Sequence, residues 1–164
     1  MIVCVTGHRP QGLPKDVSGA PTLESAVRTA ARWLLTEHKA TWLLSGMALG
    51  VDQWVAEEAL TVPGVQVCAA IPCLQQERFW SRDAQAKYID LLSRVHAKHF
   101  VTTEPYRKHV MQLRNQWMVD QAALVFAVFG GTPGGTANCV KYAIAARKPI
   151  LRFDPTTRSG EWIR

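Results

Sequence analysis

A glycine-rich segment, GGTPGGT at residues 130–136, separates an apolar stretch from a predicted helix. Glycine lets the backbone approach a ligand closely, and free N–H groups at the start of a helix attract negative oxygen atoms. Threonine hydroxyls add further hydrogen-bond donors. A flexible turn without a ligand is the alternative interpretation. We expect ligand contacts from the small residues of this segment, which are Gly130, Gly131, Thr132, Gly134, Gly135 and Thr136.

A second turn of small residues, SGMALGVD at residues 45–52, also leads from a predicted strand into a predicted helix. Asp52 could cap that helix, or it could accept a hydrogen bond from a ribose hydroxyl. Because a carboxylate repels phosphate, we expect Asp52 to lie beside a bound phosphate and not directly on it. The small residues would let an anion reach the start of the helix. The expected contacts here are Ser45, Gly46, Ala48 and Gly50.

The segment TGHRP, residues 6–10, directly follows the first predicted strand. Gly7 permits a sharp turn, and Arg9 can donate two hydrogen bonds to a phosphate. A surface arginine on a loop is the alternative interpretation of Arg9. His8 is a weaker candidate, because a lone histidine beside a turn more often makes a structural hydrogen bond. We include Gly7, His8 and Arg9 in the candidate binding site.

Arg114 and Asn115 lie in a predicted helix, among apolar side chains that repeat at helical spacing. An arginine on a buried stripe needs a partner, because an unpaired buried charge is very costly. The partner is either a structural carboxylate such as Asp120 or the anion of a ligand. We therefore add Arg114 and Asn115 to the candidate ligand contacts.

An aromatic pair, Phe79 and Trp80, is flanked by charged residues on both sides. Such a pair could stack on a nucleobase or contact another subunit. Packing of a helix onto the sheet is the commoner role of aromatic residues at such positions. The sequence leaves these three interpretations open.

Short apolar runs alternate with helical stretches, which predicts a mostly parallel sheet with helices on both faces. This order is typical of an α/β protein with a Rossmann-like three-layer sandwich, here as a single domain over residues 1–164. In such sheets ligands bind beyond the carboxyl ends of the strands, where the candidate residues fall. The expected strands are residues 2–6, 42–45, 65–71, 100–102, 124–129 and 149–153, and the expected helices are residues 22–38, 51–61, 75–97, 107–122 and 137–147.

The composition indicates a globular protein with an anionic partner. The formal net charge is +6 at pH 7, and the pI is about 9.4. No apolar run is long enough to span a membrane, and the first residues lack the pattern of a signal peptide, so we expect a cytoplasmic protein. The four cysteines lack the paired spacing of a zinc site. We expect no metal, no disulfide and no required cofactor.

Four segments together resemble the SLOG superfamily, which groups DNA-processing proteins of the Smf/DprA type with Lonely Guy phosphoribohydrolases. The match is strongest to its YpsA-like branch. The resemblance rests on the order and spacing of TGHRP at 6–10, SGMALGVD at 45–52, RN at 114–115 and GGT at 134–136. It implies a Rossmann-like fold, a pocket for a nucleotide or a nucleotide-derived molecule, and assembly as a homodimer.

One position departs from the Lonely Guy pattern, in which a glutamate that serves N-glycosidic cleavage follows Gly-Thr-x-x. Alignment on Gly135 and Thr136 places Cys139 at that position, and a neutral thiol does not stabilise the cationic sugar of this reaction. We therefore expect binding or sensing of a nucleotide-type ligand without chemistry. Hydrolysis of nucleoside 5′-monophosphates, with a carboxylate such as Asp52, is one alternative, and binding of single-stranded DNA is the other.

Overall fold

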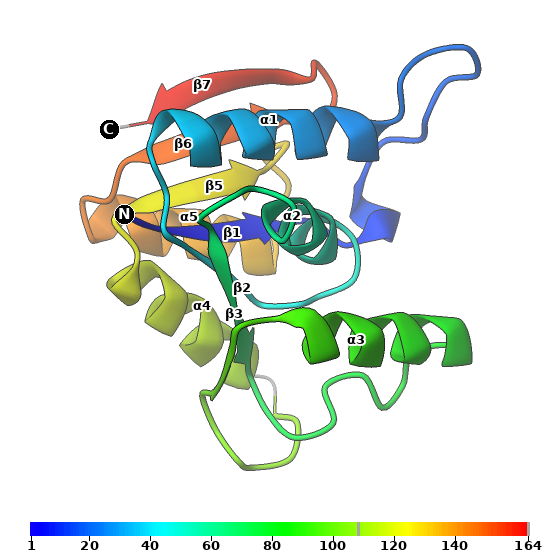
Figure 1. Cartoon of the computed structure of the whole chain (residues 1–164), viewed down its shortest axis with the longest axis vertical. Coiled ribbons are helices and arrows are strands. Elements are labelled where there is room, and N and C mark those ends of the chain that lie inside the picture. The colour runs from blue at the N-terminus through cyan, green and yellow to red at the C-terminus, as the bar shows by residue number, and fades with distance from the viewer. Residues whose placement is uncertain (108, 164) are drawn as a thin grey trace.

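A seven-stranded sheet forms the centre of the protein, in the computed structural model that describes residues 1–107 and 109–163. The strands lie in the order β4-β3-β2-β1-β5-β6-β7, and all of them except β4 are labelled in Figure 1. Neighbouring strands are parallel from β4 to β6, and β7 runs antiparallel to β6. The strand bounds are β1 Ile2–Gly7, β2 Trp42–Ser45, β3 Gln66–Ile71, β4 Ala97–Phe100, β5 Leu124–Val128, β6 Ile150–Asp154 and β7 Ser159–Ile163.

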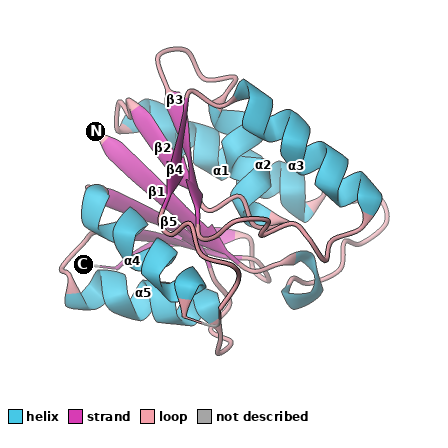
Figure 2. Ribbon diagram, turned by 90° about the horizontal axis from the view of Figure 1, so that it is seen from below, coloured by secondary structure: helices cyan, strands magenta, loops and turns pink. Residues whose placement is uncertain are grey.

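Helices cover both faces of the sheet, as Figure 2 shows. Helices α1, α2 and α3 pack on one face, and α4 and α5 pack on the other. Each face therefore has its own hydrophobic core. The helix bounds are α1 Leu23–Glu37, α2 Val51–Ala59, α3 Arg82–Arg94, α4 Val110–Gln121 and α5 Gly135–Ala145, and a short 3-10 helix covers Pro10–Gly12.

Burial on both faces explains why the central strands are apolar at successive positions. All five residues of β5 are buried. Leu124, Phe126 and Val128 belong to the core beneath α1–α3, whereas Val125 and Ala127 belong to the core beneath α4 and α5. This alternation is the period of two of a strand, with an apolar layer on each side.

The predicted fold class, a Rossmann-like three-layer α/β sandwich, is confirmed by the sheet and its two helical layers. Two strands at the edges of the sheet differ from the prediction. The strand expected at 100–102 is β4, Ala97–Phe100, whose exposed Lys98 lies in an edge strand and interrupts the apolar pattern. Strand β7 was not predicted, because four of its five residues are exposed and it has no apolar run.

The helix predicted over residues 75–97 is too long at both ends, since α3 covers Arg82–Arg94 and residue 97 already begins β4. Helix α3 begins after Ser81, whose hydroxyl accepts a hydrogen bond from the N–H of Ala84 at 3.2 Å. This is the geometry of a helix N-cap. The helix therefore starts here, although the apolar residues before Ser81 had suggested an earlier start. Residues 75–80 form turns instead of a helix, so the aromatic pair lies outside α3.

The strand order reverses at β1, which lies between β2 and β5. Gly7 at the end of β1 is in register with Val128 at the end of β5, so the two strands end side by side. The segments that follow them leave the sheet toward opposite faces. A reversal of this kind opens a crevice at the carboxyl ends of the strands.

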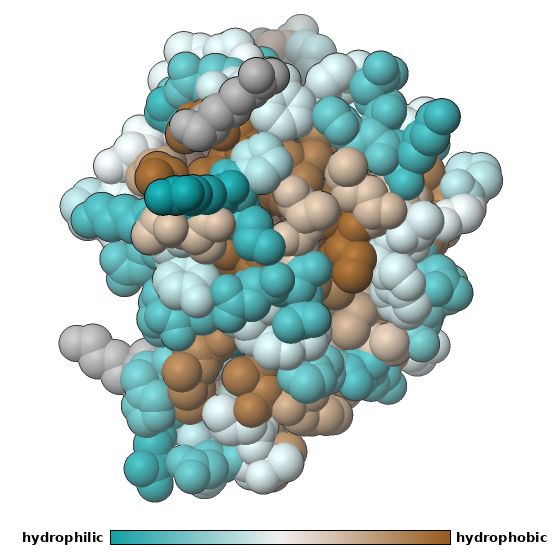
Figure 3. All heavy atoms as spheres, turned by 90° about the vertical axis from the view of Figure 1, so that its left-hand side faces the viewer, coloured by the Kyte–Doolittle hydropathy of each residue, from teal (hydrophilic) through white to brown (hydrophobic). Residues whose placement is uncertain are grey.

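The face of the molecule at the left of Figure 1 is a mosaic in which hydrophobic side chains lie among hydrophilic ones (Figure 3). The start of β1 and the end of β7 lie on the same side of the molecule, at the left of Figure 1. Within residues 1–107 and 109–163, none of the helices combines the length and the apolar character that a bilayer crossing requires.

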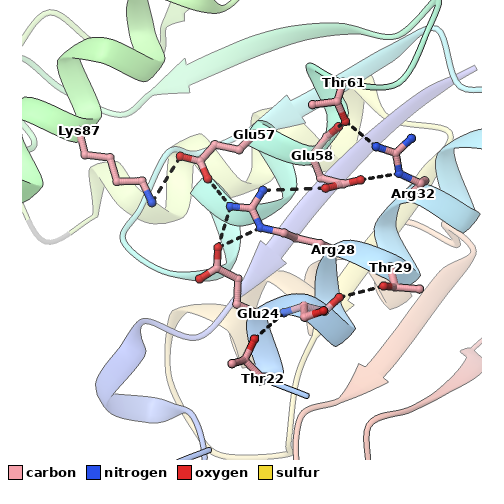
Figure 4. Close-up of polar contacts among 10 residues, drawn as sticks. Thr22, Glu24, Arg28, Thr29, Arg32, Glu57, Glu58, Thr61 and Lys87 are labelled. Carbon is pink, nitrogen blue, oxygen red and sulfur yellow. Dashed lines mark hydrogen bonds and ion pairs between the residues drawn. The ribbon is translucent and has the colours of Figure 1, made fainter. Parts of the chain in front are cut away.

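A cluster of charged residues connects the outer sides of α1, α2 and α3 (Figure 4). Arg28 on α1 donates to Glu24 at 2.7 Å and also to Glu57 on α2. Glu57 in turn pairs with Lys87 on α3 at 3.3 Å. Because Arg28 and Glu57 are partly buried, solvent screens their interaction less than it screens isolated surface pairs.

We expect Arg28→Ala to lower the free energy of unfolding by about 1 to 2 kcal/mol, because two carboxylates lose their shared partner. Arg94→Ala is the matched control, since it removes an exposed pair with Asp90 and should change stability by less than about 0.5 kcal/mol. Urea denaturation of both variants measures the difference. Equal losses would show that the cluster adds nothing beyond an ordinary surface pair.

Candidate ligand-binding site

A cavity of about 350 Å³ opens at the carboxyl ends of β1 and β5, where the strand order reverses. Its walls come from the segment after β1, the turn before α2, helix α4 and the start of α5. This volume lies within the range of small-molecule pockets. The candidate residues that line the cavity are Gly7, His8, Arg9, Ala48, Asp52, Arg114, Asn115, Gly135 and Thr136.

Arg114 is a buried cation with 5% of its surface exposed. Its Nη1 donates to the carbonyl oxygen of Gly46 at 2.5 Å, and its Nε donates to Oδ1 of Asn115 at 2.8 Å. Asp120 instead accepts from the hydroxyl of Tyr142 at 2.9 Å. The proposed pairing of Arg114 with Asp120 is therefore wrong, because six residues of helix turn the two side chains to different faces of α4.

Asp52 lies in the first turn of α2 with 5% of its surface exposed. Its Oδ2 accepts from the N–H of Ala48 at 3.3 Å, and the N-cap of α2 is Gly50. Asp52 therefore does not cap the helix, contrary to one of its two interpretations. Burial raises the pKa of Asp52 to about 6, although the positive charge of Arg114 opposes this rise. At neutral pH the carboxylate is mostly ionised and can accept hydrogen bonds.

Gly46 does not line the cavity, although the sequence suggested it as a ligand contact. A Cβ atom at Gly46 would lie 1.8 Å from Nη1 of Arg114 and 2.8 Å from Oδ2 of Asp52. Glycine is therefore required here because the guanidinium and the carboxylate both approach the backbone closely.

Ser45 and Gly50 are also absent from the cavity wall. The Ser45 hydroxyl donates to the carbonyl oxygen of Asp52 at 2.8 Å and accepts from the N–H of Met47 at 3.2 Å. Gly50 has a φ of +88°, and a Cβ there would lie 3.0 Å from Cδ of Pro10. Both residues fix the shape of the turn, and the hydroxyl and the φ angle account for them without a ligand.

The glycine-rich turn after β5 contributes its last two residues, Gly135 and Thr136, to the cavity. The N-cap of α5 is Gly134, and no side chain of the described residues caps this helix. The first N–H groups of α5 therefore remain available at the cavity wall. The rest of the predicted segment does not line the cavity, namely Gly130, Gly131, Thr132 and Gly134.

His8 and Arg9 differ in their surroundings. Nε2 of His8 lies 3.3 Å from the hydroxyl of Thr132, and its ring lies 5.7 Å from that of Phe129, so His8 joins the first turn to the glycine-rich turn. Partial burial lowers the pKa of His8, which favours the neutral ring at pH 7. Arg9 is exposed, and no carboxylate in residues 1–107 and 109–163 forms an ion pair with it.

Sequence reasoning missed four residues of the cavity wall. Met111 lies three residues before Arg114 on α4, and this helical spacing could have identified it. Thr6 is the last buried side chain of β1, and its position one residue before Gly7 was a signal as well. Gln11 and Gly12 enter through the 3-10 helix, which no pattern in the sequence predicted.

Cys139, at the position of the Lonely Guy glutamate, does not line the cavity. Its side chain is fully buried behind Thr6, and burial raises the pKa of Cys139 to about 11. The thiol is therefore neutral and separated from any ligand. Asp52 is the one carboxylate in the cavity wall that the structure describes.

The cavity has a positive part and a negative part. Arg9 and the start of α5 supply donors that have no direct partner among the described residues. Arg114 lies beside Asp52 and offsets more of its charge than Arg9 does. Such an arrangement can bind an anion and a hydroxyl group at the same time. In the part of the chain that the structure describes, no group of three or more His, Cys, Asp or Glu side chains could hold a metal ion.

The fold, with a cavity at the reversal of strand order, is that of a Rossmann-like α/β protein. The model described as the YspA SLOG family matches residues 3–149, and the chain belongs to this family.

Curated relatives agree with this assignment. The chain is 28% identical over 127 residues to the "Uncharacterized SPbeta prophage-derived protein YoqJ" of Bacillus subtilis (strain 168), a match that covers 67% of this chain and 73% of the relative. It is 30% identical over 133 residues to a UPF0398 protein of Levilactobacillus brevis, with 74% of this chain and 70% of the relative covered.

DNA processing protein A from Helicobacter pylori, a protein that binds single-stranded DNA, has a similar fold, with a TM-score of 0.65. The two chains are 18% identical, and the similarity covers 93% of this chain and 64% of that one. At this identity the likeness shows the fold alone. The chain thus spans less than two thirds of that protein's length.

Titration of Asp52 gives a prediction about stability. Its pKa is about 6 in the folded protein against 3.8 for an unperturbed aspartate, so the folded state binds the proton more tightly. The contribution of Asp52 to stability is therefore complete below the lower pKa and is lost as the pH rises through 6. We expect the stability of Asp52→Asn relative to the wild type to increase by about 2 kcal/mol between about pH 4.5 and pH 7.

Urea denaturation of both proteins at the two pH values measures this difference. Because asparagine retains an oxygen that can accept from Ala48, the comparison isolates the charge. If the two stabilities stay parallel across this pH range, the carboxylate is not desolvated as described.

Proposed function

We propose that the protein binds a nucleotide or a nucleotide-derived molecule in this cavity, as a binding protein or sensor. The observation that supports the proposal best is the uncapped start of α5, which shares one cavity with the exposed Arg9. Backbone N–H groups and a guanidinium around one space are the donors that a phosphate requires. Membership of the YspA SLOG family supports the same class of ligand.

The distribution of charge favours one place for the phosphate. Arg114 already donates to Gly46 and Asn115 and lies beside Asp52, so much of its charge is compensated. Arg9 makes no direct ion pair among the described residues, although its charge also acts on Asp52, and the first turn of α5 has no side-chain cap. The phosphate therefore binds at Gly135 and Thr136, on the side of the cavity away from the carboxylate.

The opposite side of the cavity suits a sugar. Asp52 accepts hydrogen bonds on this side. Asn115 lies nearer the phosphate side, because its Nδ2 donates to the carbonyl oxygen of Gly135 at 3.4 Å. A ribose hydroxyl could donate to the Asp52 carboxylate while the phosphate lies on α5. One ligand with a phosphate and hydroxyl groups thus satisfies both parts of the cavity.

Arg9→Ala is expected to weaken binding about tenfold or more without loss of stability, because the side chain is exposed and has no ion-pair partner among the described residues. Calorimetric titration with AMP, GMP, CMP and UMP measures the affinity. Arg94→Ala, which removes a cation at the far end of α3, is the matched control and should bind as the wild type does. No binding of any phosphate compound to the wild type, or an unchanged affinity of Arg9→Ala, would refute the proposal.

A second candidate function is hydrolysis of the N-glycosidic bond in nucleoside monophosphates. The observation that favours it is the position of Asp52 in the cavity wall with a pKa of about 6, near the working range of an acid–base group. If this activity exists, the wild type releases free base from the four monophosphates, and Asp52→Asn lowers the rate at least about 100-fold. Chromatography of the products decides this, and absence of free base at high protein concentration would exclude the reaction.

We include in the proposal a homodimer, as the family resemblance implies, and a cytoplasmic location, as the sequence predicts. Single-stranded DNA is the alternative ligand, because the Helicobacter pylori protein binds it and this chain has a net charge of +6. Salt separates the two ligands. Binding of DNA through many phosphates weakens steeply with salt, whereas binding of one nucleotide has a shallow salt dependence.

A further inference from the structure

A second cavity, of about 550 Å³, adjoins the candidate site and shares Arg9 and Met111 with it. It lies between the segment that follows β3 and the segment that follows β4, so both cavities open along the same edge of the sheet. The remaining lining residues are Leu74, Gln75, Gln76, Arg78, Phe79, Trp80, Pro105 and Tyr106.

The two aromatic residues of the pair noted in the sequence, Phe79 and Trp80, have different roles in this cavity. Trp80 packs inward, with its ring 5.3 Å from that of Tyr88 in an edge-to-face arrangement, and it contacts the core beneath α1–α3. Phe79 is 85% exposed and contributes nothing comparable to the core. Helix packing therefore accounts for Trp80 and leaves Phe79 without a structural role.

Two other flat side chains that can stack line the same cavity as this exposed ring. The guanidinium of Arg78 lies 5.4 Å from the centre of the Phe79 ring, and Tyr106 lines the same cavity with 58% of its surface exposed. Aromatic rings and guanidinium planes are the surfaces on which nucleobases stack. No carboxylate is among the residues that line the cavity, whereas Arg9 and Arg78 both line it.

Hydrogen bonds hold the walls of this cavity together. The N–H of Leu74 donates to the carbonyl oxygen of Glu104 at 3.3 Å, which joins the two segments. Gln76 donates to the hydroxyl of Tyr88 at 2.9 Å and to the carbonyl oxygen of Gly46 at 3.4 Å. The same carbonyl accepts from Arg114, so one backbone oxygen links the wall of the second cavity to the first.

We propose that the second cavity binds the nucleobase of the ligand whose phosphate and sugar occupy the first cavity. Phe79 and Tyr106 stack on the base, and the exposed amide of Gln75 offers a donor and an acceptor to its edge. Arg9 lies between the two cavities, where it contacts the phosphate. This inference rests on the proposed function, because it divides that one ligand between the two cavities.

The experiment compares ribose 5-phosphate with AMP, GMP, CMP and UMP by calorimetric titration. For the wild type, at least one of the four nucleotides should bind at least about tenfold more tightly than ribose 5-phosphate, because only nucleotides carry a base to stack. Phe79→Ala should weaken that nucleotide about 5- to 100-fold and leave ribose 5-phosphate unchanged. Since Phe79 is exposed, the variant is expected to fold, which circular dichroism confirms.

Two further variants sharpen the comparison. Phe100→Ala removes an equally large ring that is partly exposed on β4 but does not line the cavity, so nucleotide affinity should be that of the wild type. Tyr106→Phe keeps the ring and should retain nucleotide binding, whereas Tyr106→Ala should weaken it.

The possible outcomes separate this inference from the proposed function. If nucleotides bind no better than ribose 5-phosphate, or Phe79→Ala binds them as the wild type does, the base does not occupy the second cavity, although the first cavity still binds phosphate. Phe79 would then be free for another role, such as contact with a protein. If the wild type binds none of the five compounds, the proposed function itself fails.

Discussion

The hydrogen bond from Arg114 to the carbonyl oxygen of Gly46 holds the candidate site together, because it fastens α4 to the turn between β2 and α2. Inside the protein the dielectric constant is low, so a buried guanidinium persists only with acceptors and a nearby negative charge. Asn115 supplies one acceptor and Asp52 the charge. A side chain at position 46 would occupy the space of both charged groups. This cluster therefore explains the presence of Gly46 and of Asp52 without reference to a ligand.

These contacts of Arg114 also decide which groups of the cavity wall are free to bind a ligand. A cation that already has acceptors and a neighbouring negative charge attracts a further anion weakly. Backbone N–H groups without a cap and a solvent-exposed guanidinium still lack hydrogen-bond partners. In this protein those groups belong to the start of α5 and to Arg9. The polarity of the cavity thus depends on which of its polar groups already form hydrogen bonds within the protein. A ligand must supply acceptors for the donors that are still free.

Much of this arrangement could be predicted from the sequence. Apolar runs such as β5 predicted the sheet and its layers. The turns after these runs predicted most of the cavity wall, because the carboxyl ends of parallel strands lie at the same edge of the sheet. The sequence could not separate glycines that a ligand requires from those that packing requires. Gly46 and Gly135 look alike in the sequence, and the crowding at Gly46 depends on Arg114, which lies far along the chain. Exposed edge strands such as β7 lack the apolar pattern on which strand prediction depends.

The two edges of the sheet limit how copies of the chain can associate. The edge strands are β4, with four residues, and β7, with five, and each has a charged side chain, Lys98 in β4 and Glu161 in β7. Short, charged edges are poor templates for pairing with a strand of another molecule. A continuous intermolecular sheet is therefore unfavourable, and two copies would have to meet through helices or loops, away from the backbone groups that strand addition needs.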